Sequence, residues 1–316
     1  MNFFKSKAKK INVPYNMIRP PNISDFDWRN RVNKLFNSIY TISYLYYEQL
    51  KDTHYNLKEN YNSLKLSIKN IKASLFNCLY ISYYQNFPSD DQLLNIINTE
   101  FSKANIVFIF TDNTNFIPID MKCGIIYAET AKNQLEIYIN ENFIKFLRKG
   151  FTNQEYLDEL AKSIFNEYTH EYTHLYQINQ EKIPQKSIEI NDIKTLNDIK
   201  IYLSHQREID AHAREAAAEL AQYYNSLGNI LNMLKQISGA LCKSKAYEKY
   251  YATFGKVYKY IPETIKLMKN LDPNAEKEII RDKKIFNQFR KRIYDFLLLD
   301  KKFLFDKNNN DLNPLS

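Results

Sequence analysis

The sequence is poor in the residues that build disulfide frameworks and flexible turns. It contains only 3 cysteines and 5 glycines in 316 residues. Cys78, Cys123 and Cys242 are odd in number, lie far apart and form no C-x-x-C pair. We therefore expect neither a disulfide framework nor a thiolate zinc site, and we expect all three to be buried as small hydrophobic residues.

Long apolar runs are missing as well. A transmembrane helix needs roughly 18 or more consecutive apolar residues, and no stretch of the chain comes close, so we expect no membrane span. The start, MNFFKSKAKKINVPYN, lacks the apolar core of a classical signal peptide. These absences favour a cytoplasmic or virion-associated protein. The Asn-, Lys-, Ile- and Tyr-rich composition is typical of an AT-rich viral or bacterial genome.

The residues that are present favour a packed, mainly helical α+β protein. Hydrophobic residues make up 44% of the chain and charged residues 25%, with 25 tyrosines and 20 phenylalanines as large packing residues. We expect three regions. An extended arm and helical hairpin occupies residues 1–90, an α+β core occupies 91–228, and a basic helical region occupies 229–316.

Periodicity places the elements within these regions. Apolar residues at helical spacing predict a helical hairpin or one long bent helix over 27–82, and Ser89 predicts a helix start after Pro88. Further helices are predicted over 152–177 and 204–226, and beyond Gly228 with breaks near Gly239, Pro262 and Pro273. Short β-like runs lie at 106–110, 124–127 and 135–139, the last with clean alternation.

The charge is unevenly distributed. Residues 229–316 hold 18 of the 44 basic and 10 of the 36 acidic residues, so this region carries the whole formal net charge of +8. Such segregation indicates an acidic partner or nucleic acid, although helices of mixed charge more often present a solvated face. No G-x-x-x-x-G-K-[ST] or G-x-G-x-x-G motif is present, so nucleotide cofactors are unsupported.

One motif carries chemistry. The stretch from His170 to His174 reads H-E-Y-T-H, which fits H-E-x-x-H and is expected by chance roughly 0.01 times in such a chain. Two histidines four apart on a helix lie on one face and can reach a single zinc ion. Glu171, rotated from them by about 100°, can take a proton from a metal-bound water.

A catalytic zinc needs a third protein ligand, and the next predicted helix offers candidates. His205, Glu208 and His212 share one face of that helix at spacings of three and four. Small neighbours, Ala211, Ala213, Ala216 and Ala217, would allow this helix to approach the first one closely.

This pattern resembles the gluzincin branch of the zincin metallopeptidases over roughly residues 90–227. The resemblance implies a zincin-like core with metal ligands His170, His174 and Glu208 and with Glu171 as general base. It also implies an edge strand that aligns an extended peptide, a role that we assign to Leu135–Asn140.

Several gluzincins carry an acidic residue four positions after the glutamate ligand, which orients a ligand histidine. Here His212 occupies that position, so it could be the orienting partner, a transition-state donor or a competing ligand, with Asp210 as the nearest carboxylate. Tyr202, Arg207 and Arg214 could donate to a tetrahedral oxyanion, although packing and ion pairs are the commoner roles of such residues.

The sequence therefore predicts a zinc metalloendopeptidase that acts on peptides or proteins. One alternative is a virion component or other structural protein that uses a zincin fold as a scaffold. Another is a nucleic-acid-binding protein that uses its basic C-terminal helices.

Overall fold

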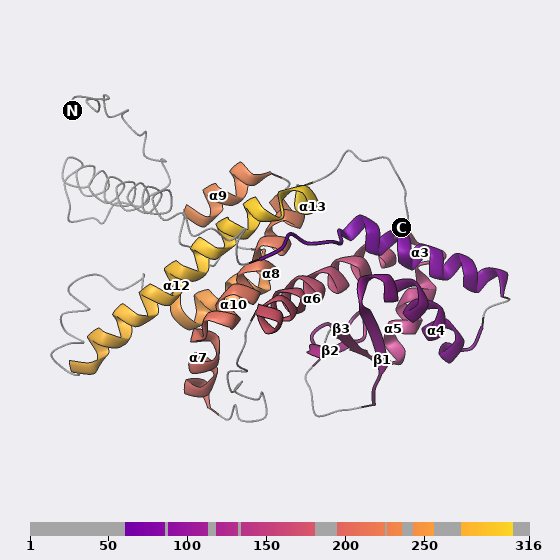
Figure 1. Cartoon of the computed structure of the whole chain (residues 1–316), viewed down its shortest axis with the longest axis horizontal. Coiled ribbons are helices and arrows are strands. Elements are labelled where there is room, and N and C mark those ends of the chain that lie inside the picture. Colours follow the sequence, from indigo (N-terminus) through magenta and orange to yellow (C-terminus); the bar gives the residue numbers. More distant parts are fainter. Residues whose placement is uncertain are drawn as a thin grey trace, which may run out of the picture. The chain divides into compact units, whose positions relative to one another are not determined.

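The computed structural model describes residues 61–85, 88–112, 118–131, 134–180, 195–224, 226–235, 243–255 and 273–305. All of them belong to one compact unit, Asn56–Ser316. They form a mainly helical structure with one small sheet, as predicted from the sequence (Figure 1). In chain order the elements are α3 (Ile68–Tyr84), α4 (Asp90–Phe101), a 3-10 turn (Ser102–Ala104), β1 (Ile106–Phe110), β2 (Ile125–Ala131), β3 (Gln134–Ile139), α5 (Glu141–Lys149), α6 (Gln154–Gln180), α7 (Leu196–Ser204), α8 (Gln206–Tyr224), α9 (Leu227–Lys235), α10 (Lys245–Phe254), α12 (Pro273–Leu299) and α13 (Lys301–Phe305).

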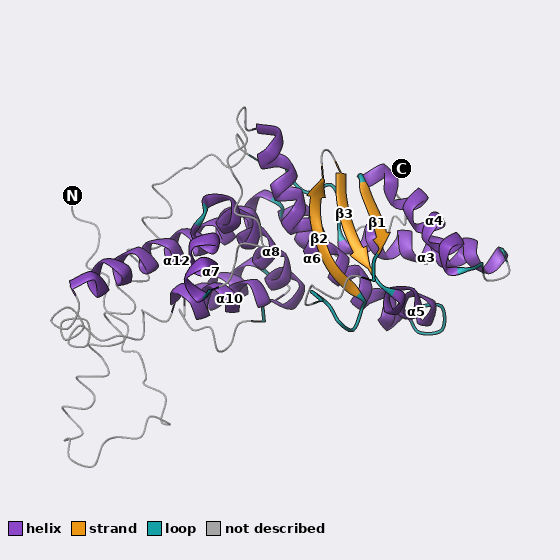
Figure 2. Ribbon diagram, turned by 90° about the horizontal axis from the view of Figure 1, so that it is seen from below, coloured by secondary structure: helices purple, strands orange, loops and turns teal. Residues whose placement is uncertain are grey.

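The three strands form one mixed sheet in the order β1-β3-β2 (Figure 2). Strand β3 pairs in parallel with β1 and antiparallel with β2. Leu135, Ile137 and Ile139 are buried on one face, which confirms the predicted alternation. The assignment of Leu135–Asn140 as an edge strand was wrong, because β3 lies at the centre. Alternation reports which face of a strand is buried and gives no information on how many strands flank it.

Helix starts follow local capping chemistry. Ser89 caps α4 as predicted, and its hydroxyl accepts from the Gln92 backbone while the Gln92 side chain accepts from Ser89. The same arrangement at Ser67 and Asn70 starts α3 at Ile68. The apolar pattern that predicted a longer helix is interrupted there, and residues 61–67 lie outside any helix.

Two hydrophobic clusters make up the core, with α6 in the first and most of α8 in the second. The first combines α3, α4, the sheet, α5 and the first half of α6, and the second combines α7 to α10 with α12. Each cluster includes residues from both sides of the region boundaries that we expected at residues 90 and 228. The division of the chain into three regions stays a prediction. Pro273 opens α12 as expected, whereas Gly239, Pro262 and residues 27–60 lie outside the described residues.

Two smaller expectations can be compared with the structure. Cys78 and Cys123 are buried as free thiols, and Cys242 lies outside the described residues. Among the described helices, none is both long enough and apolar enough to cross a membrane.

A buried ion pair fastens α8 to the end of α12. Arg214 donates from Nε to Asp300 Oδ2 over 2.8 Å and from Nη2 to Oδ1 over 2.9 Å. Its guanidinium also donates to the Asn62 carbonyl, and the Leu64 N-H donates to Asp300. The Arg214 side chain is only 1% exposed, so it stabilises the fold. It is too deeply buried to contact a substrate, and we no longer count it among the candidate oxyanion donors.

Arg214→Met should therefore lower the free energy of unfolding by about 3–5 kcal/mol, because it leaves the Asp300 carboxylate buried without its cation. Urea denaturation measures the loss. The control is Lys145→Met, which removes the exposed Lys145–Glu141 pair and should change stability by less than about 0.5 kcal/mol. Equal losses in the two variants would contradict this account of the ion pair.

Candidate metal centre

Helix α6 presents the two motif histidines on one face, as the spacing predicted. His170 Nε2 and His174 Nε2 lie 3.2 Å apart, and both side chains are mostly buried. The flanking apolar residues of the helix, from Leu157 to Tyr168, belong to the first hydrophobic cluster. Packing of that stripe therefore fixes which way the histidine face of α6 points.

Glu208 reaches the same point from α8. Its Oε1 lies 3.6 Å from His174 Nε2, and one ligand atom from each of His170, His174 and Glu208 falls within 4.8 Å of the others. The structure thus brings together the three residues predicted to be ligands. On α8, Ala218 packs with α6 in the first cluster, whereas Ala213, Ala216 and Ala217 pack in the second cluster, so the expectation that these three face α6 was wrong.

The protonation pattern of the histidines suits a metal ion. His170 Nδ1 lies 3.1 Å from Glu215 Oε2, and His174 Nδ1 lies 2.9 Å from Gln177 Oε1. Each partner is an acceptor, so each Nδ1 is a donor, and Nε2 is the nitrogen of each ring that could bind a metal. These His and Glu side chains could therefore hold a metal ion.

The Glu208 carboxylate adds a second argument for the fit. Its Oε2 is buried and has no hydrogen-bond partner among the described residues. Burial opposes ionisation of Glu208, but His174 and His170 outweigh it and lower its pKa. A buried carboxylate oxygen without a partner carries a desolvation cost that a cation would remove.

Glu171 is held beside this group by the sheet. Thr130 Oγ1 lies 2.8 Å from Glu171 Oε2 and 2.9 Å from the Glu171 carbonyl oxygen. Thr130 stands near the end of β2, so the contact with Glu171 comes from β2.

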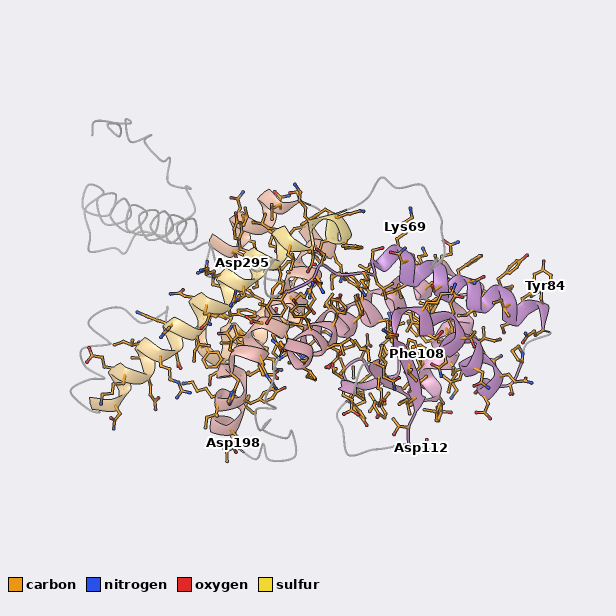
Figure 3. The ribbon with its side chains drawn as sticks, in the orientation of Figure 1. Lys69, Tyr84, Phe108, Asp112, Asp198 and Asp295 are labelled. Carbon is orange, nitrogen blue, oxygen red and sulfur yellow. The ribbon has the colours of Figure 1, made fainter. Side chains whose placement is uncertain are left out.

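The two edges of the sheet differ in availability. At the outer edge of β1, the Asn98 side chain donates to the Phe108 carbonyl and accepts from the Phe108 N-H (Figure 3 labels Phe108). At the outer edge of β2, Ile125 and Ile126 pair with the backbone of Asp120 and Ile119, and no described strand pairs with the edge beyond them. An extended peptide could therefore add to β2, next to Thr130 and Glu171.

Glu215 is a residue of the site that the sequence reasoning missed. Its Oε2 accepts from His170 Nδ1 and, over 2.8 Å, from His212 Nδ1. Burial works against the charge of Glu215, but the two imidazoles outweigh it and hold its pKa far below the usual value. The signal was present: Glu208, His212 and Glu215 recur at spacings of four and three on one helix face.

Two further carboxyl groups near Glu215 behave in the opposite way. Burial, followed by the charge of Glu215, raises the pKa of Glu167 and raises that of Glu219 to about 7. Glu219 accepts from the Ser244 hydroxyl and the Ala246 N-H, so it serves the start of α10. Of these three carboxyl groups, Glu215 is the one that is ionised and accepts hydrogen bonds from His170 and His212.

His212 is joined to His170 through Glu215, and which of its three expected roles it fills stays a prediction. Its Nδ1 donates to Glu215, and its Nε2 accepts from Lys249 Nζ over 3.1 Å. Burial, and then the Lys249 charge, lower the His212 pKa to about 4. His170, His212 and Glu215 also lie close enough to be considered as a metal site. Lys249 already bonds to Nε2 of His212, and Glu215 already accepts two N-H groups. We therefore interpret this second grouping as hydrogen-bond support for His170, one of the three predicted ligands.

The remaining predicted residues lie at different distances from the ligands. Asp210 is buried and bonded to Tyr61, Gln206 and Arg292, so it contacts no ligand directly. Tyr202 is a hydrogen-bond partner of the Glu208 side chain.

His205 does not share a face with Glu208 and His212. It lies between α7 and α8 in extended backbone, with an exposed side chain. Its inclusion in the predicted helix was wrong, because α8 begins one residue later. His54 lies outside the described residues.

Comparisons with protein-family models, with curated proteins and with solved structures give no match for this chain. The chemistry of the site therefore rests on its own geometry.

Glu215→Gln should weaken Zn²⁺ binding about 10–100-fold, because an amide oxygen cannot replace a carboxylate that accepts two N-H groups. Competition with a chromophoric chelator measures the affinity. Glu155→Gln, an exposed change in the first turn of α6, is the matched control and should bind as the unmodified protein does. Indistinguishable affinities in the two variants would refute the role of Glu215.

Proposed function

We propose that this chain is a zinc-dependent metallopeptidase of the gluzincin type. His170, His174 and Glu208 would hold the ion, and Glu171 would act as general base. The observation that carries the proposal is the convergence of His170 Nε2, His174 Nε2 and the Glu208 carboxylate, within 4.8 Å of one another, beside Glu171. Two nitrogens and one carboxylate, with a further coordination position for water, are a common ligand set for catalytic zinc.

A zinc ion bound there would lower the pKa of a coordinated water to about 7 and polarise a carbonyl group. Glu171 would remove the proton from that water and return it to the leaving amine. The Thr130 hydroxyl restrains the Glu171 carboxylate. The Tyr202 hydroxyl bonds to Glu208, and Tyr202 and Arg207 stay predictions as donors toward developing negative charge.

The substrate would be an extended peptide paired with the outer edge of β2. Backbone hydrogen bonds to a strand edge align a peptide with little dependence on its side chains. This edge leads directly to Thr130, whose hydroxyl contacts Glu171. The scissile bond would therefore be presented to the general base from the sheet side of the site.

Glu171→Gln should retain zinc and lower kcat for peptide hydrolysis about 10²–10⁴-fold, because the amide cannot accept the proton of the attacking water. Turnover of a fluorogenic peptide library and the zinc content of the same preparation check both parts. Glu155→Gln again serves as control and should remain active. Full turnover by Glu171→Gln would end the proposed mechanism.

His174→Ala should raise the Kd for zinc more than about 100-fold, because the loss of a direct ligand costs more than the loss of its supporting partner. Metal analysis after dialysis provides the measurement. His205→Ala removes an exposed histidine 31 positions further along the chain and should leave the zinc content unchanged. Equal zinc in both variants would show that His174 is not a ligand.

The alternatives stay predictions. A virion or structural protein with this scaffold would bind zinc without hydrolysing any peptide, and in a particle it would be recovered in stoichiometric amounts. A nucleic-acid-binding protein would be retained on DNA with an affinity that falls steeply as salt rises.

A further inference from the structure

Behind His174 lies a chain of buried polar groups that the proposed mechanism does not use. Gln177 Oε1 lies 2.9 Å from His174 Nδ1, and Gln177 Nε2 donates to the Tyr61 hydroxyl over 3.0 Å. Tyr61 donates to Asp210 Oδ2 over 2.7 Å. Asp210 Oδ1 accepts from Arg292 Nε over 2.8 Å. The chain thus joins α6, the segment before α3, α8 and α12.

Every member of this chain behind the ligand is buried. Gln177, Tyr61, Asp210 and Arg292 are between 3% and 8% exposed. Arg292 also faces Asp295, which lies on the same helix (labelled in Figure 3), with Nη1 3.7 Å from Asp295 Oδ2. Buried polar groups are costly unless their bonds are made, so the chain persists only while its members remain paired.

The chemistry of the members fixes the direction of every bond. A carboxylate only accepts, so the Tyr61 hydroxyl must give its proton to Asp210. The Tyr61 oxygen must then accept from the Gln177 amide nitrogen, which also donates to the Arg207 carbonyl over 3.2 Å. Gln177 therefore turns its carbonyl oxygen toward His174, and His174 must carry its proton on Nδ1. Nε2 is the nitrogen left with a lone pair.

We propose that Asp210 orients the His174 imidazole for metal binding through Tyr61 and Gln177, which act as positioning residues. The proposal rests on the metal site of the proposed function. Glu215 supports His170 with a direct carboxylate contact, whereas His174 receives its support from a carboxylate two side chains away. The two ligand histidines would thus be held by two separate networks, one ending on Lys249 of α10 and the other on Arg292 of α12.

The test uses the zinc Kd of the full chain, measured by chelator competition, and the thermal midpoint of the metal-free protein. Gln177→Leu should weaken zinc binding about 10–100-fold, in the range found for partners of ligand histidines. Tyr61→Phe removes a single oxygen and keeps the ring contacts with Tyr176 and Phe296, so it should fold and should weaken binding by a smaller factor.

The double variant distinguishes a chain from two separate effects. If Tyr61 acts only through Gln177, adding Tyr61→Phe to Gln177→Leu should change the zinc Kd by less than about twofold. Gln222→Leu is the matched control, because Gln222 joins α8 to Asn166 of α6 away from the ligands. It should lower the thermal midpoint and leave the zinc Kd unchanged.

Three outcomes would overturn the proposal. They are an unchanged zinc Kd in Gln177→Leu, independent additive losses in the double variant, and a loss in Gln222→Leu as large as that in Gln177→Leu. The proposed function fails differently: if His174→Ala retains zinc, or the zinc-loaded protein cleaves no peptide, the peptidase is wrong whatever Gln177 and Tyr61 do to the Kd.

Discussion

The close contact between α6 and α8 is the constraint on which the site depends. Glu208 has a short side chain, so it reaches the histidine pair only if the two helix backbones approach closely. Ala218 of α8, which packs with α6 in the first hydrophobic cluster, permits that approach because it occupies little volume. A larger residue in its place would push the helices apart and carry the Glu208 carboxylate away from His174, without touching any ligand.

Close helix packing also forces charge into the protein. Glu171, Glu208 and His212 are each less than a tenth exposed, and Glu215 lies beside them. Buried charges are tolerated only when hydrogen bonds and opposite charges compensate for lost water. Thr130 and the shared Glu215 supply most of that compensation. Of these four side chains, Glu208 keeps a buried carboxylate oxygen, Oε2, without a hydrogen-bond partner.

The sequence predicted the parts of the site that helical geometry alone determines. The face shared by His170 and His174 follows from 3.6 residues per turn, and the same rule would have revealed Glu215 behind Glu208 and His212. It could not reveal Tyr61, because that residue lies outside any helix and meets Asp210 only through tertiary packing. The prediction that β3 is an edge strand was wrong for the same reason. Whether a strand lies at the centre or at the edge depends on which segments pack beside it in the folded protein. Its burial pattern depends only on alternation, and that was predicted correctly.

Some of the basic residues in 229–316 have roles within the fold. Arg292 is buried against Asp210, and Arg290 is only 4% exposed. Lys249 is exposed, yet its ammonium group donates to His212. Asp282 and Asp300 of the same region are buried as well, so burial of the two arginines leaves the balance of charge on its described surface nearly unchanged. Since Lys249 and Arg292 end the two networks behind the histidines, the C-terminal helices contribute to the candidate metal centre. A binding partner for this region would have to recognise the remaining lysines, such as those that α12 exposes to solvent.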